Sequence, residues 1–203
     1  MLKNTRDRII EAAIDLFSER GFNDVSVREI TRAVGIKESS LYNHFASKQE
    51  ILDEIIGYLE RQLARTALPE EKVVEMVGDM SADDFLNLSI MAFKEYMGNR
   101  SMIKIWRILS IERFRNSTAN EFFKKFLIDD AIRYQEKIFG IMMDRGLIKR
   151  FDPNLLAREF YSHTIYLYFR FFEVEGDMNP AENPDIQRMV AEHVNFITKV
   201  ISI

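Results

Sequence analysis

The sequence of 203 residues contains no cysteine and only three histidines. Without cysteine, both a disulfide framework and a thiolate-bound metal site are excluded, and the absence fits a cytosolic protein. His44, His163 and His193 are isolated from one another, so no pair has the spacing of a metal site. We therefore expect no metal and no cofactor.

Motifs that carry catalysis are missing as well. There is no nucleophile elbow and no glycine loop of the kind that holds phosphates. The acidic pairs Asp83-Asp84 and Asp129-Asp130 are sequence neighbours, so their side chains point in different directions on a helix. Such pairs are typical of solvated charge, and the sequence predicts that the protein is not an enzyme.

Long hydrophobic runs are absent too. The segment Met1–Arg8 is charged and leads into an amphipathic helix, without the apolar core of a signal peptide. No apolar run free of charge reaches the length of a membrane-spanning helix. These absences predict a soluble cytoplasmic protein without a membrane partner.

The chain also lacks the basic excess that usually marks a nucleic-acid-binding protein. Its net charge is −4, and residues 1–50 hold 8 basic and 8 acidic side chains. The remaining residues hold 20 basic and 24 acidic side chains. Any positive surface must therefore be local, and a DNA-binding function has to rest on a motif.

What the sequence does contain is helical periodicity. Apolar residues recur at spacings of three and four, and strand-like alternation is scarce. Thr5 is the expected N-cap of the first helix, and serine capping boxes precede the helices at 27 and 48. The pattern predicts an all-α fold of about nine helices, the clearest at 6–20, 27–34, 38–44, 48–66, 81–98, 102–115, 118–146, 154–173 and 184–202.

Residues 21–52 form the most informative stretch. Two short helices, Val27–Val34 and Glu38–His44, are joined by a tight turn at Gly35-Ile36. Their apolar side chains would pack inward on the first helix: Ile30, Val34, Ile36, Leu41 and Phe45. This arrangement is a helix-turn-helix, in which the second helix enters the major groove of DNA.

The second of these helices has a short polar face. Its side chains are mostly uncharged hydrogen-bonding groups suited to base edges and phosphate oxygens, namely Lys37, Ser39, Ser40, Tyr42, Asn43 and His44. Asn43 is the best candidate for reading a base, because asparagine can bind adenine through two hydrogen bonds. Arg28, Lys37 and Lys48 supply nearby positive charge, and Lys48 lies where a helix N-terminus favours a phosphate.

Residues 5–52 resemble the DNA-binding domain of the TetR family of regulators. The resemblance rests on Phe17, Gly21-Phe22, Ser26, Arg28-Glu29-Ile30, Gly35-Ile36, Leu41-Tyr42-Asn43-His44-Phe45 and Ser47-Lys48-Gln49-Glu50. The family often has serine and glycine where this chain has Lys37 and Ser39, so the recognition helix loses an obvious N-cap. The resemblance implies DNA contacts at Ser26, Arg28, Lys37, Ser39, Ser40, Tyr42, Asn43, His44 and Lys48.

The resemblance also implies partners and a domain plan. We expect a homodimer that binds double-stranded operator DNA, with repression as the family default and release by a small-molecule effector. The expected domains are a DNA-binding domain at residues 1–47 and an effector-binding and dimerisation domain at 48–203, with 48–66 as the connecting helix. One alternative stays open, a helical partner-binding protein that has lost contact with DNA.

The second predicted domain is rich in aromatic and methionine side chains. Residues 71–203 hold 13 Phe, 9 Met, 5 Tyr and Trp106, which suit an adaptable pocket for an apolar or aromatic effector but also an ordinary core. The effector candidates are Met91, Tyr96, Met102, Trp106, Tyr134, Phe139, Met143 and Tyr166.

The last two helices present more apolar surface than one subunit needs. The helix at 154–173 has two apolar faces, and the helix at 184–202 has an apolar seam with flanking hydrophobic residues. Two helices from each partner can form a four-helix bundle around a two-fold axis. The expected interface residues are Phe160, Leu167, Tyr168, Phe171, Phe172, Met189, Val190, His193 and Ile197.

Overall fold

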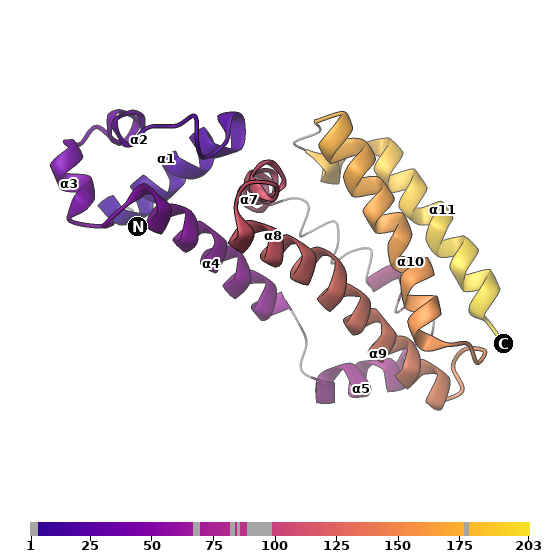
Figure 1. Ribbon diagram of the computed structural model, residues 1–203. Coiled ribbons are helices and arrows are strands. Elements are labelled where there is room, and N and C mark those ends of the chain that lie inside the picture. Colours follow the sequence, from indigo (N-terminus) through magenta and orange to yellow (C-terminus); the bar gives the residue numbers. More distant parts are fainter. Residues whose placement is uncertain (1–3, 67–69, 82–83, 85, 89–98, 177–178) are drawn as a thin grey trace. The chain divides into compact units, whose positions relative to one another are not determined.

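A computed structural model describes residues 4–66, 70–81, 84, 86–88, 99–176 and 179–203, and no strand occurs among them. The helices are α1 Thr5–Arg20, α2 Val27–Val34, α3 Glu38–Tyr42, α4 Lys48–Thr66, α5 Glu70–Asp79, α7 Arg100–Glu112, α8 Ser117–Lys124, η1 Lys125–Asp129, α9 Asp130–Asp144, α10 Pro153–Leu167, η2 Tyr168–Val174, η3 Pro180–Glu182 and α11 Pro184–Ile201 (Figure 1). The predicted all-α fold is confirmed. Helix α5 was not predicted from the sequence, and the helix predicted at 81–98 lies mostly outside the described residues.

The chain forms two compact units. The N-terminal unit comprises residues 1–67 and 101–123, and the C-terminal unit comprises 68–100 and 124–203. The first unit is larger than the predicted domain 1–47, because α4 and α7 belong to it. The physical reason for α4 is its apolar face, since Ile51, Leu52, Ile55 and Leu59 are completely buried.

In the N-terminal unit, α1 packs against both α2 and α4. Ile9, Ala13 and Phe17 of α1 are completely buried, and Phe17 meets the ring of Phe22 edge-on at 5.4 Å between centroids. The N-cap of α1 is Asn4 rather than the predicted Thr5, because the Asn4 side chain accepts a hydrogen bond from the Asp7 amide at 2.9 Å.

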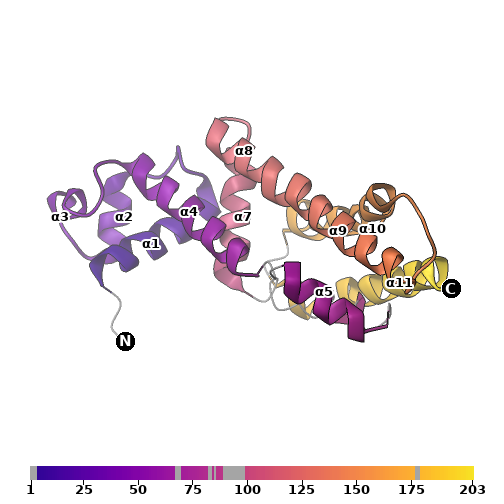
Figure 2. The ribbon, with the colours of Figure 1, turned by 90° about the horizontal axis from the view of Figure 1, so that it is seen from below.

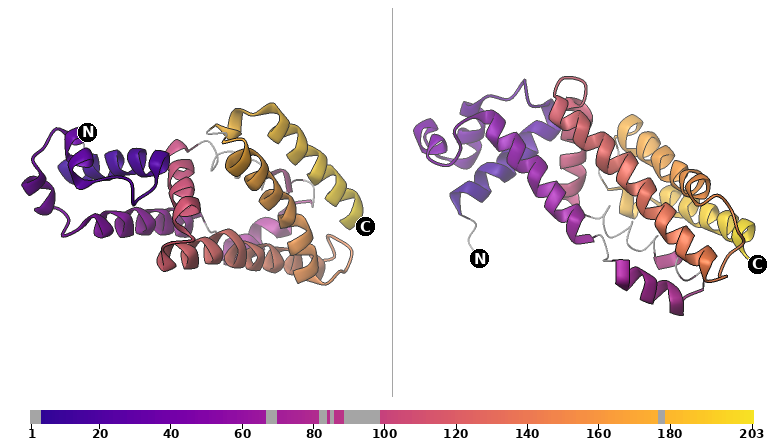
Figure 3. Two further views of the ribbon diagram at one scale, coloured as in Figure 1. Left: turned by 45° about the horizontal axis from the view of Figure 1, so that its top comes forward. Right: turned by 60° about the horizontal axis from the view of Figure 1, so that its bottom comes forward.

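In the C-terminal unit, α9 and α10 form an antiparallel hairpin, and α11 lies beside α10 (Figures 1 and 3). Helix α5 packs against α9 (Figure 2). The core between these helices contains Ile138, Phe139, Met142, Phe160 and Ile197. As predicted from their sequences, α10 and α11 begin with a capping side chain followed by proline, at Asp152 and Asn183.

Among the described residues of this unit, two segments are wider π-helical turns. The helix predicted at 118–146 is α8, η1 and α9 in succession, and the helix predicted at 154–173 is α10 followed by η2. Within η1, the carbonyl of Leu127 accepts a hydrogen bond from the Tyr161 hydroxyl of α10 at 2.7 Å. A π-helical turn shifts the backbone pairing, so its carbonyls can meet side chains of a neighbouring helix.

In the part of the chain that the structure describes, no helix combines the length and the hydrophobicity that spanning a bilayer requires.

Candidate nucleic-acid interface

The turn between α2 and α3 depends on Gly35. Its φ of 76° and ψ of 36° are left-handed, a conformation that glycine adopts without the steric cost of a Cβ atom. The amide of Ile36 donates to the carbonyl of Thr31 at 3.0 Å, which closes the end of α2. Helix α3 then begins at Glu38, and the predicted tight turn is confirmed.

The inner faces of the two helices are apolar. Ile30 and Leu41 are completely buried, and Val34 and Phe45 are almost so. Ile36 is half-buried. The predicted packing is therefore confirmed, and it fixes which face of α3 is left outside.

A capping box sets the start of α2. The Glu29 amide donates to the Ser26 hydroxyl at 3.3 Å, and the Ser26 amide donates to Glu29 Oε2 at 2.8 Å, as predicted. The hydrogen bonds from Ser26 and the neighbouring Arg20 guanidinium lower the pKa of Glu29 to about 2. Glu29 therefore stays ionised, with its negative charge at the N-terminus of α2.

The predicted DNA contacts of this region lie on α2, on α3 and in the residues next to these helices. Tyr42 is 53% exposed. Ser40 is half-buried. The remaining predicted contacts of this region are exposed, namely Ser26, Arg28, Lys37, Ser39, Asn43 and His44. Lys37 is the N-cap of α3 and makes no capping hydrogen bond through its side chain, in line with the departure from the family pattern.

Lys48 differs from the other predicted contacts because its ammonium group binds its own chain. Lys48 Nζ donates to the carbonyls of Phe22 and Val25 at 2.7 and 2.8 Å, and lies 4.2 Å from the centroid of the Phe22 ring. Burial lowers the pKa of Lys48, while the carboxylates of Glu112, Asp24 and Glu29 act to raise it. Lys48 thus ties the start of α4 to the segment that connects α1 and α2.

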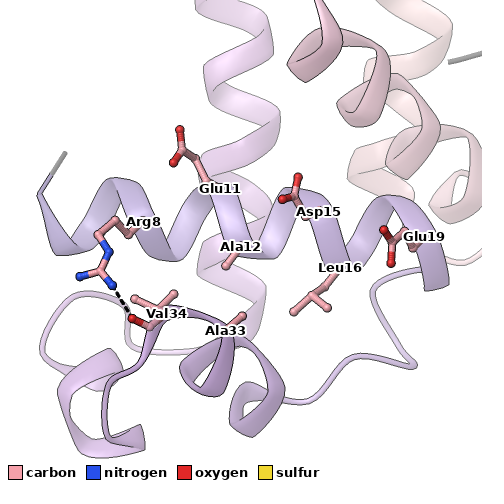
Figure 4. Close-up of a pocket in the computed structure, with 8 residues that line it drawn as sticks. All are labelled: Arg8, Glu11, Ala12, Asp15, Leu16, Glu19, Ala33 and Val34. Carbon is pink, nitrogen blue, oxygen red and sulfur yellow. Dashed lines mark hydrogen bonds between the residues drawn. The ribbon is translucent and has the colours of Figure 1, made fainter. Parts of the chain in front are cut away.

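A surface pocket lies between α1 and α2, on Arg8, Glu11, Ala12, Asp15, Leu16, Glu19, Ala33 and Val34 (Figure 4). Ala12 and Leu16 of α1 face Ala33 and Val34 of α2, and Arg8 donates to the Val34 carbonyl. Three carboxylates line this pocket, so it repels phosphate and does not extend the predicted DNA-binding surface.

Comparison with known proteins identifies the family. Residues 9–55 match the model of the bacterial regulatory proteins of the tetR family. The chain is 45% identical over 184 residues to the HTH-type transcriptional repressor KstR2 of Rhodococcus jostii, which covers 85% of this chain and 82% of that protein. The chain belongs to the TetR family. It is a DNA-binding transcriptional regulator.

Solved structures of bacterial regulators share the fold over nearly the whole chain. A TetR family regulator from Pseudomonas syringae pv. tomato superposes with a TM-score of 0.71 at 16% identity, over 100% of both chains. A regulator from Saccharomonospora viridis in complex with choline superposes with a TM-score of 0.67 at 18% identity, over 98% of this chain and 97% of that one.

The predicted effector residues of this TetR-family chain are spread over both units. Met102 and Trp106 on α7 are buried in the N-terminal unit, where Trp106 contacts the rings of Phe122 and Phe123. In the C-terminal unit, Phe139 and Met143 are core side chains, Tyr134 is half-buried and Tyr166 is 44% exposed. Met91 and Tyr96 lie outside the described residues. Among the described candidates, Met102, Trp106, Phe139 and Met143 are thus all buried side chains, whereas Tyr134 and Tyr166 are not.

The predicted dimer residues differ in how deeply they are buried. Five of the nine are buried within the chain itself, namely Phe160, Leu167, Phe171, Phe172 and Ile197, whereas Tyr168, Met189, Val190 and His193 are half-buried. A side chain that is already buried offers little further area to a second copy. The same helices instead expose other hydrophobic side chains, namely Leu155, Tyr166, Phe169, Phe196 and Val200.

Sequence reasoning missed two residues of the N-terminal unit that only the fold brings to this region. Gly21 has a φ of 81°, and Glu112 at the end of α7 is only 2% exposed. Gly21 was named only within the Gly21-Phe22 motif, without a role toward α7. No sequence signal indicated Glu112, since an acidic residue in an amphipathic helix ordinarily faces solvent.

Proposed function

We propose that this TetR-family regulator is a repressor that binds a palindromic operator as a homodimer and is released from it by a small effector. The observation that carries the proposal is the exposed polar face of α3, held outward by the buried Leu41 and Phe45. The similarity to a protein named as a repressor supports the direction of regulation.

In this proposal, α3 lies in the major groove and α2 crosses the backbone. Asn43 reads a base, and Tyr42 and Lys48 bind phosphates. Lysine has three N–H donors, so Lys48 keeps one beyond the two that its own chain accepts. Ser26, Arg28, Lys37, Ser39, Ser40 and His44 complete the proposed contacts.

The dimer is proposed to form through α10, η2 and α11. Large exposed apolar patches are rare on monomeric proteins, and these three segments expose Phe169, Phe196 and Val200 at 41%, 63% and 38%. An interface between two copies would cover such side chains around a two-fold axis. The buried members of the predicted set would then support this surface from within the subunit.

We further propose that the effector is a small apolar or aromatic molecule. Residues 48–203 would bind this effector and form the dimer interface. In this proposal the protein acts in the cytoplasm and catalyses no reaction. The regulator of similar fold that holds choline supports a role for a small ligand. Of the described effector candidates, Trp106 supplies a fluorescence signal, because it is the only tryptophan in the chain. A ligand releases DNA only when it binds the free protein more tightly than the DNA-bound protein.

The test is to select binding sites from random-sequence duplex DNA with the purified protein and to measure affinity by fluorescence anisotropy. A selected palindrome is expected, with half-sites about one helical turn apart. Asn43→Ala should lower affinity about 5- to 150-fold and relax the sequence preference at one position of each half-site. If no sequence is enriched over the library, the alternative of a helical partner-binding protein without DNA contact is favoured.

A further inference from the structure

A buried carboxylate joins α7 to the segment between α1 and α2. Glu112 is 2% exposed, and its Oε1 accepts a hydrogen bond from the Phe22 amide at 2.9 Å. Phe22 and Glu112 are 90 residues apart in sequence but lie in the same compact unit. A charged side chain is rarely buried without a partner, so this contact determines where the end of α7 sits.

The backbone at Gly21 is adapted to this contact. A Cβ atom at Gly21 would lie 3.2 Å from Glu112 Oε1 and 3.1 Å from Ile111 Cγ2. The φ of 81° there also disfavours other residues. Glycine therefore allows both the turn after α1 and the close approach of the carboxylate.

The same segment is held from its other side by α4. The Phe22 amide donates to Glu112, and the Phe22 carbonyl accepts from Lys48 Nζ, which also donates to the carbonyl of Val25. Ser26, the N-cap of α2, follows directly. The backbone that precedes α2 is thus fixed between an acceptor from α7 and a donor from α4.

We propose that Glu112 is a positioning residue for DNA binding, through which α7 holds the segment 21–26 and Lys48 in the arrangement that engages the operator. The inference rests on the proposed function, because Ser26 and Lys48 are proposed DNA contacts. Helix α7 also carries Met102 and Trp106, two of the proposed effector-binding residues. A ligand that binds there and displaces α7 would withdraw the Glu112 carboxylate from the Phe22 amide.

An ion pair between α7 and α1 provides a matched control. Lys104 Nζ lies 2.8 Å from Asp15 Oδ1, and the two side chains are 34% and 61% exposed. Exposed ion pairs contribute little to stability. Lys104→Ala removes this link from α7 and leaves Glu112 in place.

The test compares three changes at position 112 in the full chain, using an operator selected by the unmodified protein. Glu112→Ala removes the acceptor, Glu112→Asp keeps the charge but shortens the reach by one methylene, and Glu112→Gln keeps the reach but removes the charge. Operator affinity and amide exchange in residues 18–26 are measured at a temperature where circular dichroism finds each variant folded.

Glu112→Ala is expected to weaken operator binding about tenfold and to speed exchange of the Phe22 amide, because a buried donor loses its partner. Glu112→Asp should resemble it, whereas Glu112→Gln should stay within about threefold of the unmodified protein, since its amide oxygen still accepts. Lys104→Ala should change affinity less than about twofold. If Glu112→Ala does not fold, the inference is tested by comparing the operator affinities of Glu112→Asp and Glu112→Gln.

The inference is overturned if folded Glu112→Asp binds the operator as the unmodified protein does, or if affinity falls without faster exchange of the Phe22 amide. A greater loss of operator affinity for Glu112→Gln than for Glu112→Asp also overturns it. Operator binding would then depend on the charge of the side chain and not on its length. Failure of the unmodified protein to select any operator refutes the proposed function instead, and is recognised before any variant is made.

Discussion

Lys48→Met separates the structural role of Lys48 from its proposed contact with DNA. Methionine keeps most of the apolar stem but removes the ammonium group that donates to the carbonyls of Phe22 and Val25 at 2.7 and 2.8 Å. The change also removes the cation that lies 4.2 Å from the Phe22 ring centroid. A charged hydrogen bond contributes about 1.5–3 kcal/mol, and a cation–π contact at a partly exposed site about 0.5–1 kcal/mol.

These contributions are partly offset, because a half-buried ammonium no longer has to be desolvated. We therefore expect Lys48→Met to lower the free energy of unfolding by about 2 kcal/mol. The assay is urea denaturation followed by circular dichroism at one fixed protein concentration, since association of subunits would raise apparent stability.

Lys37→Met is the control, because Lys37 is an exposed lysine on the same proposed surface. Its unfolding free energy should change by less than about 0.5 kcal/mol. It should weaken operator binding and lower the salt dependence by about one unit. A change below about 0.5 kcal/mol for Lys48→Met as well would refute the structural role that its hydrogen bonds indicate.

Ser26→Ala should lower the free energy of unfolding by about 1 kcal/mol in chemical denaturation, because it removes the cap of α2; an unchanged midpoint would contradict this. Gly35→Ala should cost about 1–2 kcal/mol in the same assay, since its φ of 76° penalises a Cβ atom. Burial lowers the pKa values of His163 and His193, whose stacked rings lie 4.3 Å apart between centroids. The unfolded chain therefore takes up these protons first, so stability is full above a pH of about 6.5 and declines as the pH falls toward the lowered pKa values. His163→Gln should flatten this decline, and equal slopes for both proteins between pH 7.5 and 5 would exclude the pair as its cause. Phe196→Asp should shift sedimentation toward the monomer with helicity retained, whereas an intact dimer would place the interface elsewhere.

Local signals in the sequence were sufficient for the helix-turn-helix. The capping box from Ser26 to Glu29, the left-handed turn at Gly35 and the apolar spacing of Ile30 and Leu41 involve residues close together in the chain. Interactions of this range are set by the sequence itself, so the two helices, their turn and their outward polar face could be predicted. The match to the family model covers the same stretch, residues 9–55, and supports the same prediction of a helix-turn-helix.

The helical domain was predicted less well, because periodicity identifies an apolar face but not what covers it. Leu167 and Phe171 are buried within the chain, whereas Phe169, which lies between them, and Phe196 of α11 are exposed. Both kinds of residue recur at helical spacing, so the sequence alone could not distinguish a side chain of the core from one at a surface. The π-helical turns η1 and η2 add to this uncertainty, since each changes the direction of the side chains that follow it.

Sequence alone determined that this chain is helical, that residues 27–44 form a helix-turn-helix, and which side chains of α3 stay outside. Tertiary structure decided that α7 belongs with the DNA-binding helices, that Lys48 binds the carbonyls of Phe22 and Val25, and that Glu112 holds the Phe22 amide. The physical reason is the range of the interactions. A capping box spans four residues, whereas the contact between Phe22 and Glu112 spans 90, and only packing of the whole unit brings those atoms together.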